Sequence, residues 1–331
     1  MDTVAPCQRS ETTTRPASVA ILSRSFSRHP ALRAELLAQY PRAVFNDSGA
    51  ILKGQALIDF VAPHEAAIVG LETIDDALMA ALPKLRILSK YGVGLDNIDL
   101  EAAARRGLKV ASQPGVNRRS VAELAISYMI CGLRGVMVSF DEIRRGVWRQ
   151  YAGRQLSNAT VGLIGFGHVG TEAAGLLRAF GSRVLAHDIR DIAAPAARLD
   201  VQPVDLTSLF EKSDVVSLHV PLTARTANML DEFAFAAMKP GVVIVNVARG
   251  GLIDEAALDR ALRSGQVAAA CLDVFAREPP EDSELFSRPG FLGTAHIGGS
   301  AEEAILAMGR AALHGLSAAG DPRALIPAWL D

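Results

Sequence analysis

Four ionisable side chains in the second half of the chain lie where predicted strands end. Each lies in or shortly after a run of apolar residues of the kind that forms buried parallel strands. They are Arg249, Asp273, Glu278 and His296. Ligands of open parallel sheets bind beyond the carboxyl ends of the strands, so these residues are candidates for a single site.

Three of these side chains together suit hydride transfer at C2 of a small 2-hydroxy acid. The guanidinium of Arg249 can bind a carboxylate at two points and polarise the neighbouring carbonyl. His296 can exchange a proton with the 2-hydroxyl because the ordinary pKa of histidine is near neutrality. A carboxylate beside it, such as Glu278, favours the protonated form. Taken singly, each of the three is more often a surface or capping group, and spacing alone does not show that Glu278 and His296 meet.

A glycine-rich stretch upstream predicts a binding site for a dinucleotide. Strand 160–164 is followed by glycines at G-x-G-x-x-G spacing, by a helix with an apolar side, and by a strand at 183–186. Gly165 suits the tight turn, Gly167 the close approach of a pyrophosphate, and Gly170 the packing of helix on strand. The alternative is a glycine-rich turn that binds no ligand.

The residue after the second strand, Asp188, indicates which dinucleotide. It can accept hydrogen bonds from both ribose hydroxyls of NAD and would repel the 2′-phosphate of NADP. Arg190 nearby would attract that phosphate, but Asp188 would oppose it. Free N–H groups and the dipole at the start of the helix favour the pyrophosphate. We therefore expect NAD as the cofactor.

The rest of the chain alternates short apolar runs with helical patterns, which predicts two α/β domains with parallel sheets. Strands are expected at 19–22, 43–45, 66–71, 86–89 and 108–111, and later at 215–219, 242–247, 268–274 and 291–295. Helices are expected at 29–39, 75–82 and 100–106, and later at 206–211, 232–238, 255–264 and 302–318. The first set of strands precedes the nucleotide-binding strand and should form a domain of its own.

Two helices are expected between the two sets of strands. The first, 120–134, begins with Ser120 and Glu123 at the spacing of a capping box. The second, near 138–148, is rich in arginine and has an apolar side that looks exposed. We expect it to act as an arm in a homodimer; the alternative is a helix that covers its own domain.

Composition limits the class of protein. The 331 residues are 50% hydrophobic with a formal net charge of −2, which gives no reason to expect nucleic acid or a membrane as a partner. The three cysteines, at 7, 131 and 271, lack metal-ligand spacing, so we expect no metal site and a reducing, cytoplasmic location. Residues 1–16 lack the apolar core of a secretory signal and are expected to be a flexible tail.

Seven motifs resemble the D-isomer-specific 2-hydroxyacid dehydrogenases, and most closely the phosphoglycerate dehydrogenase-like branch. They occur in the order and at the spacing of that family. They are YGVGLDNIDL (91–100), PGVNRRSVAEL (114–124), GLIGFGHVG (162–170), HVPLT (219–223), NVARGGLID (246–254), LDVFAREPP (272–280) and TAHIGGS (294–300). The resemblance implies a Rossmann NAD-binding domain, a flavodoxin-like substrate domain, and catalysis by Arg249, Glu278 and His296.

The resemblance also implies domain bounds and further contacts. The substrate domain would be discontinuous, with 17–112 and 298–331 flanking an NAD-binding domain at 113–297. The substrate would meet backbone N–H groups of Val93 and Gly94 as well as Arg249 and His296. Besides the three glycines and Asp188, the cofactor would contact His168, Val169, Pro221, Thr226, Val247, Ala248, Asp273, Gly298 and Gly299. Asp273 can accept from the nicotinamide carboxamide or, alternatively, cap the next turn.

Two departures from the family pattern bear on the substrate. Phosphoglycerate dehydrogenases carry an arginine for the substrate phosphate after the strand at 66–69, whereas this chain has Gly70, Leu71 and Glu72. A carboxylate there would repel a phosphate, so we expect a substrate other than 3-phosphoglycerate. Lys90, Arg118 or Arg119 would supply a second positive contact, unless they are solvated charges or flank a helix start. Ala295 replaces the proline that usually precedes the histidine, and we expect little effect from it.

These observations predict an NAD-dependent oxidoreductase that interconverts a D-2-hydroxy acid and its 2-oxo acid. One alternative is a dehydrogenase of another small anion, such as formate or phosphite; formate dehydrogenases of this superfamily have a longer N-terminal domain and a glutamine before the histidine. The other is a non-catalytic, NAD-sensing protein like the transcriptional corepressors of this fold, which can keep all three catalytic side chains. No partner-binding tail or terminal extension is recognised that would favour it.

Overall fold

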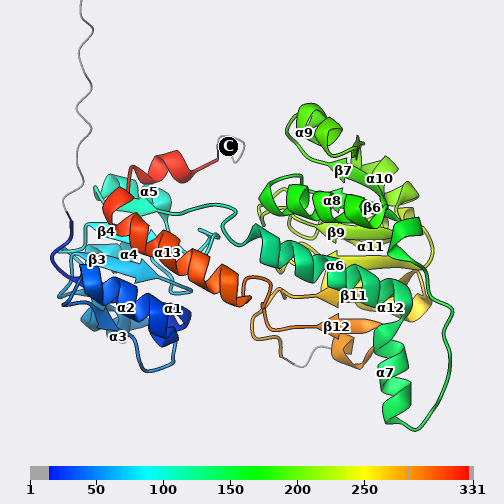
Figure 1. The fold of residues 1–331 in the computed structure, drawn as a ribbon, viewed down its shortest axis with the longest axis horizontal. Helices are drawn as coiled ribbons and strands as arrows, with labels where there is room; N and C mark the ends of the chain where they lie inside the picture. The colour runs from blue at the N-terminus through cyan, green and yellow to red at the C-terminus, as the bar shows by residue number, and fades with distance from the viewer. Residues whose placement is uncertain (1–14, 282–283, 328–331) are drawn as a thin grey trace, which may run out of the picture. The chain divides into compact units, whose positions relative to one another are not determined.

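A computed structural model describes residues 15–281 and 284–327, so all but the last two residues of the expected tail lie outside the described range. The chain divides into two compact units. One holds the residues up to Val116 and those from Ile305 onward, and the other runs from Asn117 to Ala304. Each unit is built on its own parallel sheet (Figure 1).

The first unit contains a five-stranded parallel sheet in the order β2-β1-β3-β4-β5. Its strands are β1 (Val19–Ile21), β2 (Val44–Phe45), β3 (Ala66–Val69), β4 (Ile87–Lys90) and β5 (Lys109–Ala111). Its helices are α1 (Arg24–Arg28), α2 (Pro30–Gln39), α3 (Gly54–Val61), α4 (Asp76–Ala80), α5 (Leu100–Arg105), the 3-10 turn η3 (Pro322–Leu325) and most of α13 (Glu302–Ala318). This strand order is the flavodoxin-like one, as expected.

The C-terminal helix α13 belongs to the first unit because its apolar side packs with the N-terminal strands. Ala312, Leu313 and Leu316 lie in one buried cluster with Phe26 and with Val19 and Ile21 of β1. The hydroxyl of Ser89 on β4 donates to the carbonyl of Ala312. The first unit is therefore discontinuous in sequence.

The second unit contains a seven-stranded parallel sheet in the order β12-β11-β10-β9-β6-β7-β8. Its strands are β6 (Thr160–Ile164), β7 (Arg183–His187), β8 (Gln202–Pro203), β9 (Val215–Leu218), β10 (Val242–Asn246), β11 (Val267–Leu272) and β12 (Phe291–Gly293). Its helices are α6 (Arg118–Arg134), α7 (Val136–Arg144), α8 (His168–Phe180), α9 (Ala193–Arg198), α10 (Leu206–Lys212), α11 (Glu232–Ala237) and α12 (Glu255–Ser264), with 3-10 turns η1 (Leu156–Asn158) and η2 (Glu284–Ser287). The order reverses between β6 and β9, which is the switch point of the doubly wound Rossmann sheet.

Alternate residues of the central strands face opposite sides of this sheet. On β10, Val243 and Val245 pack with α6 and α8, whereas Val242 and Ile244 pack with α10, α11 and α12. A strand buried on both faces reads as one apolar run, which is why these strands were predictable from the sequence. The predicted fold class, two doubly wound parallel-sheet domains, is confirmed.

Several short elements were not predicted. They are α1, α3, α9 and β8, none longer than eight residues. Such segments are too short for a periodic pattern to stand out. Among the three helices, α1 has a side-chain cap, in which the hydroxyl of Ser23 accepts from the N–H of Phe26, whereas α3 and α9 have none.

The predicted capping box at Ser120 is wrong. The structure begins α6 at Arg118, with Asn117 at the N-cap position and no side-chain cap. Ser120 instead donates to the carbonyl of Gly298, and Glu123 pairs with Arg119. The hydroxyl serves a tertiary contact that the local sequence does not reveal.

Among the described residues, no single helix has both the length and the apolar composition to cross a membrane. Helices α6 and α7 pass that test only together, across a bend of 64°. Eight residues of α6 are buried within the second unit, including Val121, Ala125 and Met129.

Candidate active site

The turn between β6 and α8 has the geometry of a phosphate-binding loop. Gly165 has a φ of +98°, and a Cβ there would lie 2.6 Å from the carbonyl oxygen of His219. A Cβ on Gly170 would lie 2.1 Å from the carbonyl oxygen of Gly165, so no larger residue fits. The Cβ position of Gly167 is open, with only Arg190 Nη2 at 3.8 Å. Because Gly167 is also the N-cap of α8 and offers no side-chain cap, the first N–H groups of the helix are available to a pyrophosphate.

Asp188 lies at the end of β7, where an acceptor for ribose hydroxyls is expected. One carboxylate oxygen accepts from the N–H of Phe166 at 2.8 Å, which ties Asp188 to the glycine turn. Arg190 pairs with both oxygens, at 2.9 Å and 2.8 Å. Burial alone would raise the pKa of Asp188, but the hydrogen bonds from Arg190 and Phe166 outweigh it and lower the pKa to about 2.

A cavity of about 320 Å³ lies beside this pair. Its lining includes the polar side chains of Asp188 and Arg190 and the apolar side chains of Ile192, Pro203 and Val204. A mixed apolar and polar wall next to the ribose acceptor suits an adenosine group.

Glu278 and His296 form an ion pair, as the chemistry requires. The Nδ1 atom of His296 lies 2.9 Å from Oε2 of Glu278. Their shared hydrogen bond raises the pKa of His296 above its ordinary value, against the opposing effects of burial and of the positive charge on Arg249. Burial would raise the pKa of Glu278, but the bond to His296 lowers it overall. Both shifts favour an imidazolium–carboxylate pair.

Arg249 lies close enough to this pair to act on it electrostatically. Its positive charge contributes to lowering the pKa of both Glu278 and His296. The loop that carries it is folded by Asn246, the last residue of β10, which is 1% exposed. The side chain of Asn246 donates to the carbonyl of Arg249 at 2.8 Å and accepts from the N–H of Ala248 at 3.0 Å. Arg249, Glu278 and His296 thus all lie in the second unit, with Glu278 and His296 in direct contact.

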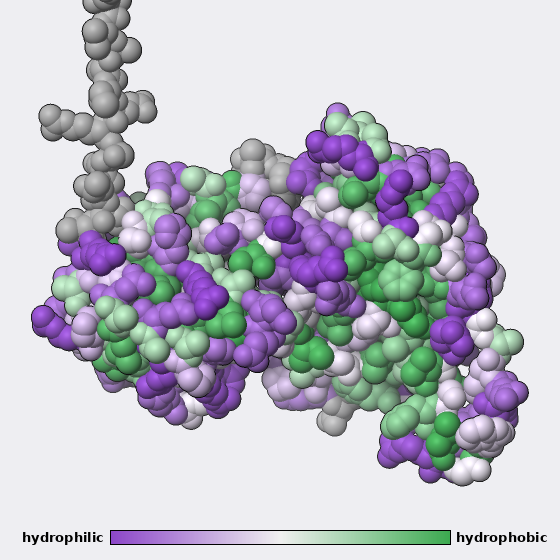
Figure 2. Space-filling view, in the orientation of Figure 1, coloured by the Kyte–Doolittle hydropathy of each residue, from purple (hydrophilic) through white to green (hydrophobic). Residues whose placement is uncertain are grey.

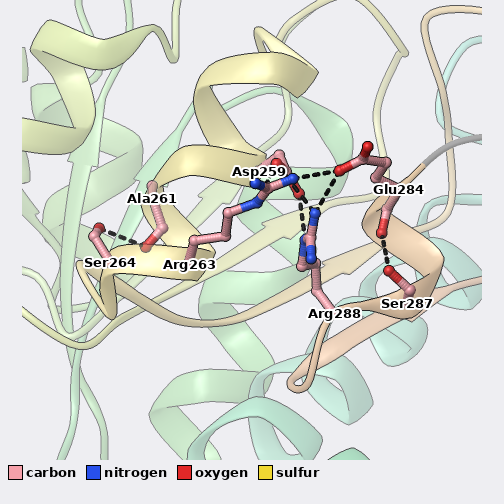
Figure 3. A network of polar contacts seen from close by, with 7 residues as sticks. All are labelled: Asp259, Ala261, Arg263, Ser264, Glu284, Ser287 and Arg288. Carbon is pink, nitrogen blue, oxygen red and sulfur yellow. Dashed lines mark hydrogen bonds and ion pairs between the residues drawn. The ribbon is translucent and has the colours of Figure 1, made fainter.

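The loop that carries Glu278 is fixed at both ends. At its start, the N–H of Phe275 donates to Oε1 of Glu278 at 3.2 Å. Phe275 also packs against Phe286, with ring centroids 5.5 Å apart. At its far end, a network of ion pairs joins η2 to α12 (Figure 3): Arg263 and Arg288 both pair with Asp259 and with Glu284. The N–H of Phe275 thus holds one carboxylate oxygen of Glu278, and the ion pairs hold residues 284 and 288 against α12.

Asp273 folds the turn that carries His296. The side chain is 1% exposed. Its two oxygens accept from the N–H groups of Ile297 and Gly298, each at 2.7 Å, and its carbonyl accepts from the N–H of His296 at 2.9 Å. His296 has a φ of +54°, an uncommon conformation for a non-glycine residue, and this clamp supports it. The side chain of Asp273 therefore caps the turn at Ile297, 24 residues further along the chain, and not the turn that directly follows it, which is the alternative role predicted from the sequence.

Comparisons with known proteins agree with this geometry. The family model described as "D-isomer specific 2-hydroxyacid dehydrogenase, NAD binding domain" matches residues 126–298. The chain belongs to this family. It is 44% identical over 232 residues to a hydroxypyruvate reductase of Thermotoga maritima, covering 69% of this chain and 75% of that protein.

Further relatives widen the range of activities within the family. The chain is 42% identical over 234 residues to a D-3-phosphoglycerate dehydrogenase of Mycobacterium leprae, covering 70% of this chain but only 44% of that protein. The chain thus matches less than half the length of that relative. The structure of a glyoxylate reductase from Paecilomyes thermophila is 30% identical, with a TM-score of 0.79 over 90% of this chain and 93% of that one.

Membership of the dehydrogenase family confirms the predicted cofactor class, because the matched domain is the NAD-binding one. The residues of this site fit NAD: the start of α8 is open, only glycine fits in the turn before it, and an acid lies at the end of β7. In addition, Nδ1 of His219 is buried beside this turn with no hydrogen-bond partner among the described residues. The part of the chain that the structure describes holds no cluster of side chains suited to a metal ion.

The other predicted contact residues of the second unit lie near the ends of its strands, and two lie in the first unit. His168 and Val169 form the first turn of α8. Thr226 donates to the carbonyl of Pro221 at 2.7 Å and thereby folds the loop after β9. Val247 and Ala248 follow β10, and Gly298 and Gly299 follow His296. Val93 and Gly94 lie in the first unit, in the loop after β4.

The structure corrects the expected role of Glu72. Its side chain is 1% exposed, and one oxygen accepts from the N–H of Gly70 at 2.8 Å. The carboxylate therefore bonds to its own loop and does not face a substrate phosphate.

Lys90, which we considered as a second positive contact or a solvated charge, is likewise buried. It is 6% exposed, and its ammonium donates to the carbonyl of Gly70 and to the side chain of Asn97. Arg118 and Arg119 both pair with Glu172 on α8, so in this structure they are partnered groups at the start of α6.

Sequence reasoning missed three buried or half-buried polar residues that shape the site. They are Asn246, Tyr128 and Thr294. Asn246 carried a signal, since it is a polar residue at the end of the apolar run VVIVN. Tyr128 and Thr294 carried none, because their contact joins residues 166 positions apart in the sequence.

Proposed function

We propose that this chain is an NAD-dependent oxidoreductase that interconverts a D-2-hydroxy acid and its 2-oxo acid. The ion pair between Glu278 and His296, with Arg249 beside it, is the observation that supports this most strongly. The cofactor, when bound, supplies or accepts the hydride at C2. The seven-stranded unit is the NAD-binding domain in this proposal, and the five-stranded unit is the substrate domain, with the bounds given above.

Each side chain of the site has a separate task in the reduction direction. Arg249 binds the carboxylate and the carbonyl oxygen of the 2-oxo acid. Glu278 keeps His296 protonated and holds its Nδ1 atom, which leaves Nε2 to give a proton to the carbonyl oxygen. The N–H groups of Val93 and Gly94 bind the substrate carboxylate, and Oδ2 of Asp273 has capacity for one further donor, such as the carboxamide.

The substrate we propose is a small 2-oxo acid without a phosphate group. The exit of β3 presents Gly70 and the exposed side chain of Leu71, and Glu72 is turned inward. None of these can bind a phosphate, and the relatives named above include enzymes for hydroxypyruvate and glyoxylate.

A turnover screen tests the function. NADH oxidation should be measured with glyoxylate, hydroxypyruvate, pyruvate and 3-phosphohydroxypyruvate. We expect turnover with at least one of the first three and a kcat/KM for the phosphorylated acid lower by about tenfold or more. Tight NADH binding without turnover on any 2-oxo acid would favour the NAD-sensing alternative.

We also propose a homodimer formed through α7 and the segment after it. No residue of α7 is buried, and the helix leaves the body of the second unit (Figure 1). The exposed apolar side chains of α7 and the segment after it include Val136, Phe140, Ile143, Val147 and Trp148. Figure 2 shows apolar surface on this segment. So much exposed apolar area on one projecting segment suits burial against a second copy.

Negative charges introduced on α7 and the segment after it should break the dimer. We expect Phe140→Glu combined with Trp148→Glu to give monomers in size-exclusion chromatography with light scattering, because two carboxylates cannot be buried unpaired in an apolar interface. Phe233→Glu is the matched control, since Phe233 is 77% exposed on α11 and should leave the dimer intact. A monomeric parent protein, or a double variant that stays dimeric, would contradict this interface.

We place the protein in a reducing, cytoplasmic compartment. Cys131 and Cys271 are free thiols, and Cys271 is buried. Burial raises the pKa of both thiols, which keeps them unreactive.

A further inference from the structure

Two hydroxyls, of the buried Tyr128 and the half-buried Thr294, link helix α6 to the turn that carries His296. The phenol of Tyr128 contacts the hydroxyl of Thr294, and the hydroxyl of Thr294 donates to Oδ1 of Asp273. Tyr128 is 3% exposed and Asp273 is 1% exposed. Burial raises the pKa of Tyr128 to about 12, so its phenol keeps its proton at physiological pH.

The direction of this chain follows from its last member. An ionised carboxylate only accepts hydrogen bonds, so the proton of Thr294 points to Asp273. The oxygen of Thr294 is then left to accept from Tyr128. The hydrogen bond from Thr294 to Asp273 is charge-assisted, and the contact with Tyr128 polarises the hydroxyl of Thr294. Together they offset part of the cost of burying the carboxylate.

The same carboxylate holds the turn on its other side. Its oxygens accept from the N–H groups of Ile297 and Gly298, and Ser120 of α6 donates to the carbonyl of Gly298. The space is tight, since a Cβ on Gly298 would lie 3.0 Å from Oδ2 of Asp273. Two side chains of α6, Tyr128 and Ser120, therefore fix this turn from the helix side.

We propose that Tyr128 and Thr294 are positioning residues: acting through Asp273, they hold His296 in its left-handed conformation and against Glu278. The consequence for turnover rests on the function proposed above. The consequence for the imidazole does not, because it is a property of the protein without substrate or cofactor. The charged groups that act on His296 are Glu278, Asp273 and Arg249.

The decisive test is the pKa of the His296 ring, measured by NMR titration of the cofactor-free protein. Thr294→Val removes the donor to Asp273 but keeps the shape of the side chain. We expect the pKa of His296 to fall by about half a unit or more, because a looser turn weakens the contact with Glu278. Thr294→Ser, which keeps the hydroxyl, should leave the pKa of His296 at the parent value. Thr207→Val, an exposed threonine on α10, is the control.

Kinetics separate a positioning role from a general packing effect. We expect Thr294→Val to lower kcat about tenfold or more, with little change in the Kd for NADH, and Thr294→Ser to recover most of it. An unchanged pKa of His296 in Thr294→Val would overturn the proposal, and so would equal losses in the valine and serine variants. If the valine variant does not fold, Tyr128→Phe decides the matter by the same titration. A parent enzyme without turnover would refute the proposed function but leave the titration result valid.

Discussion

Replacing His296 by alanine is expected to lower kcat for 2-oxo acid reduction by about 10²- to 10⁴-fold, the usual contribution of a general acid. The imidazole sits against Glu278, and no other titratable group is placed to protonate the carbonyl oxygen in our account. The Kd for NADH should change little, because His296 acts on the substrate. Steady-state kinetics and fluorescence quenching by NADH measure the two quantities.

A control and a pH profile sharpen this prediction. His314→Ala alters an exposed histidine on α13 and should leave kcat unchanged. In Glu278→Gln, the charge that raises the pKa of His296 is gone, so that pKa falls. Reduction needs protonated His296 and is lost as pH rises through that pKa. The alkaline limb of kcat/KM should therefore move to lower pH, by about one unit.

Glu281→Gln is the matched variant for the pH profile, since Glu281 pairs with Arg277 at the surface. It should leave the profile in place. Full turnover in His296→Ala, or an alkaline limb that stays where it was in Glu278→Gln, would show that another group supplies the proton.

The second large effect concerns the choice between NAD and NADP. Asp188→Ala should reduce the preference for NAD over NADP by about 10- to 100-fold, as measured by the ratio of the two dissociation constants. The substitution removes a carboxylate that repels the 2′-phosphate, and it also releases Arg190, which now pairs with both oxygens of Asp188. A free guanidinium binds phosphate well, so both changes act in the same direction.

A double-mutant cycle separates the two contributions. If the released guanidinium matters, Asp188→Ala with Arg190→Ala should bind NADP more weakly than Asp188→Ala alone. Asp191→Ala is the control, because Asp191 lines the same cavity but caps its own turn at Ala193. An unchanged ratio in Asp188→Ala would mean that another group selects the cofactor.

The sequence was sufficient for the parts of the site that follow strands or depend on glycine. Strands buried on both faces, such as β10 and β11, read as apolar runs, so the residues after them could be placed at one edge of the sheet. Gly165 and Gly170 leave no room for a Cβ, which is why their spacing is informative. The contact of Glu278 with His296 needed the structure, because it joins two loops.

The surroundings of the charged residues Glu72 and Lys90 were harder to predict from the sequence. Glu72 lies in a loop and Lys90 is the last residue of β4, positions where charge is normally solvated, yet each is buried and bonds to a backbone group of Gly70. The residue types do not signal this, because the partners are the backbone of Gly70 and, for Lys90, also the side chain of Asn97. Likewise Ser120 looked like a helix cap but bonds to Gly298, far away in the sequence. Local patterns identify which groups carry chemistry better than they identify what those groups contact.

We expect hydride to pass between the nicotinamide and C2 of a small 2-oxo acid at the site of Arg249, Glu278 and His296, on the face of the carbonyl that gives the D isomer. The most direct test uses NADH that carries deuterium at both C4 positions, with the 2-oxo acid that gives the fastest turnover other than glyoxylate, whose product is not chiral. Mass spectrometry and chiral chromatography of the product then locate the label. We predict one deuterium at C2 of the D-2-hydroxy acid; an unlabelled product, or the L isomer, would contradict the account.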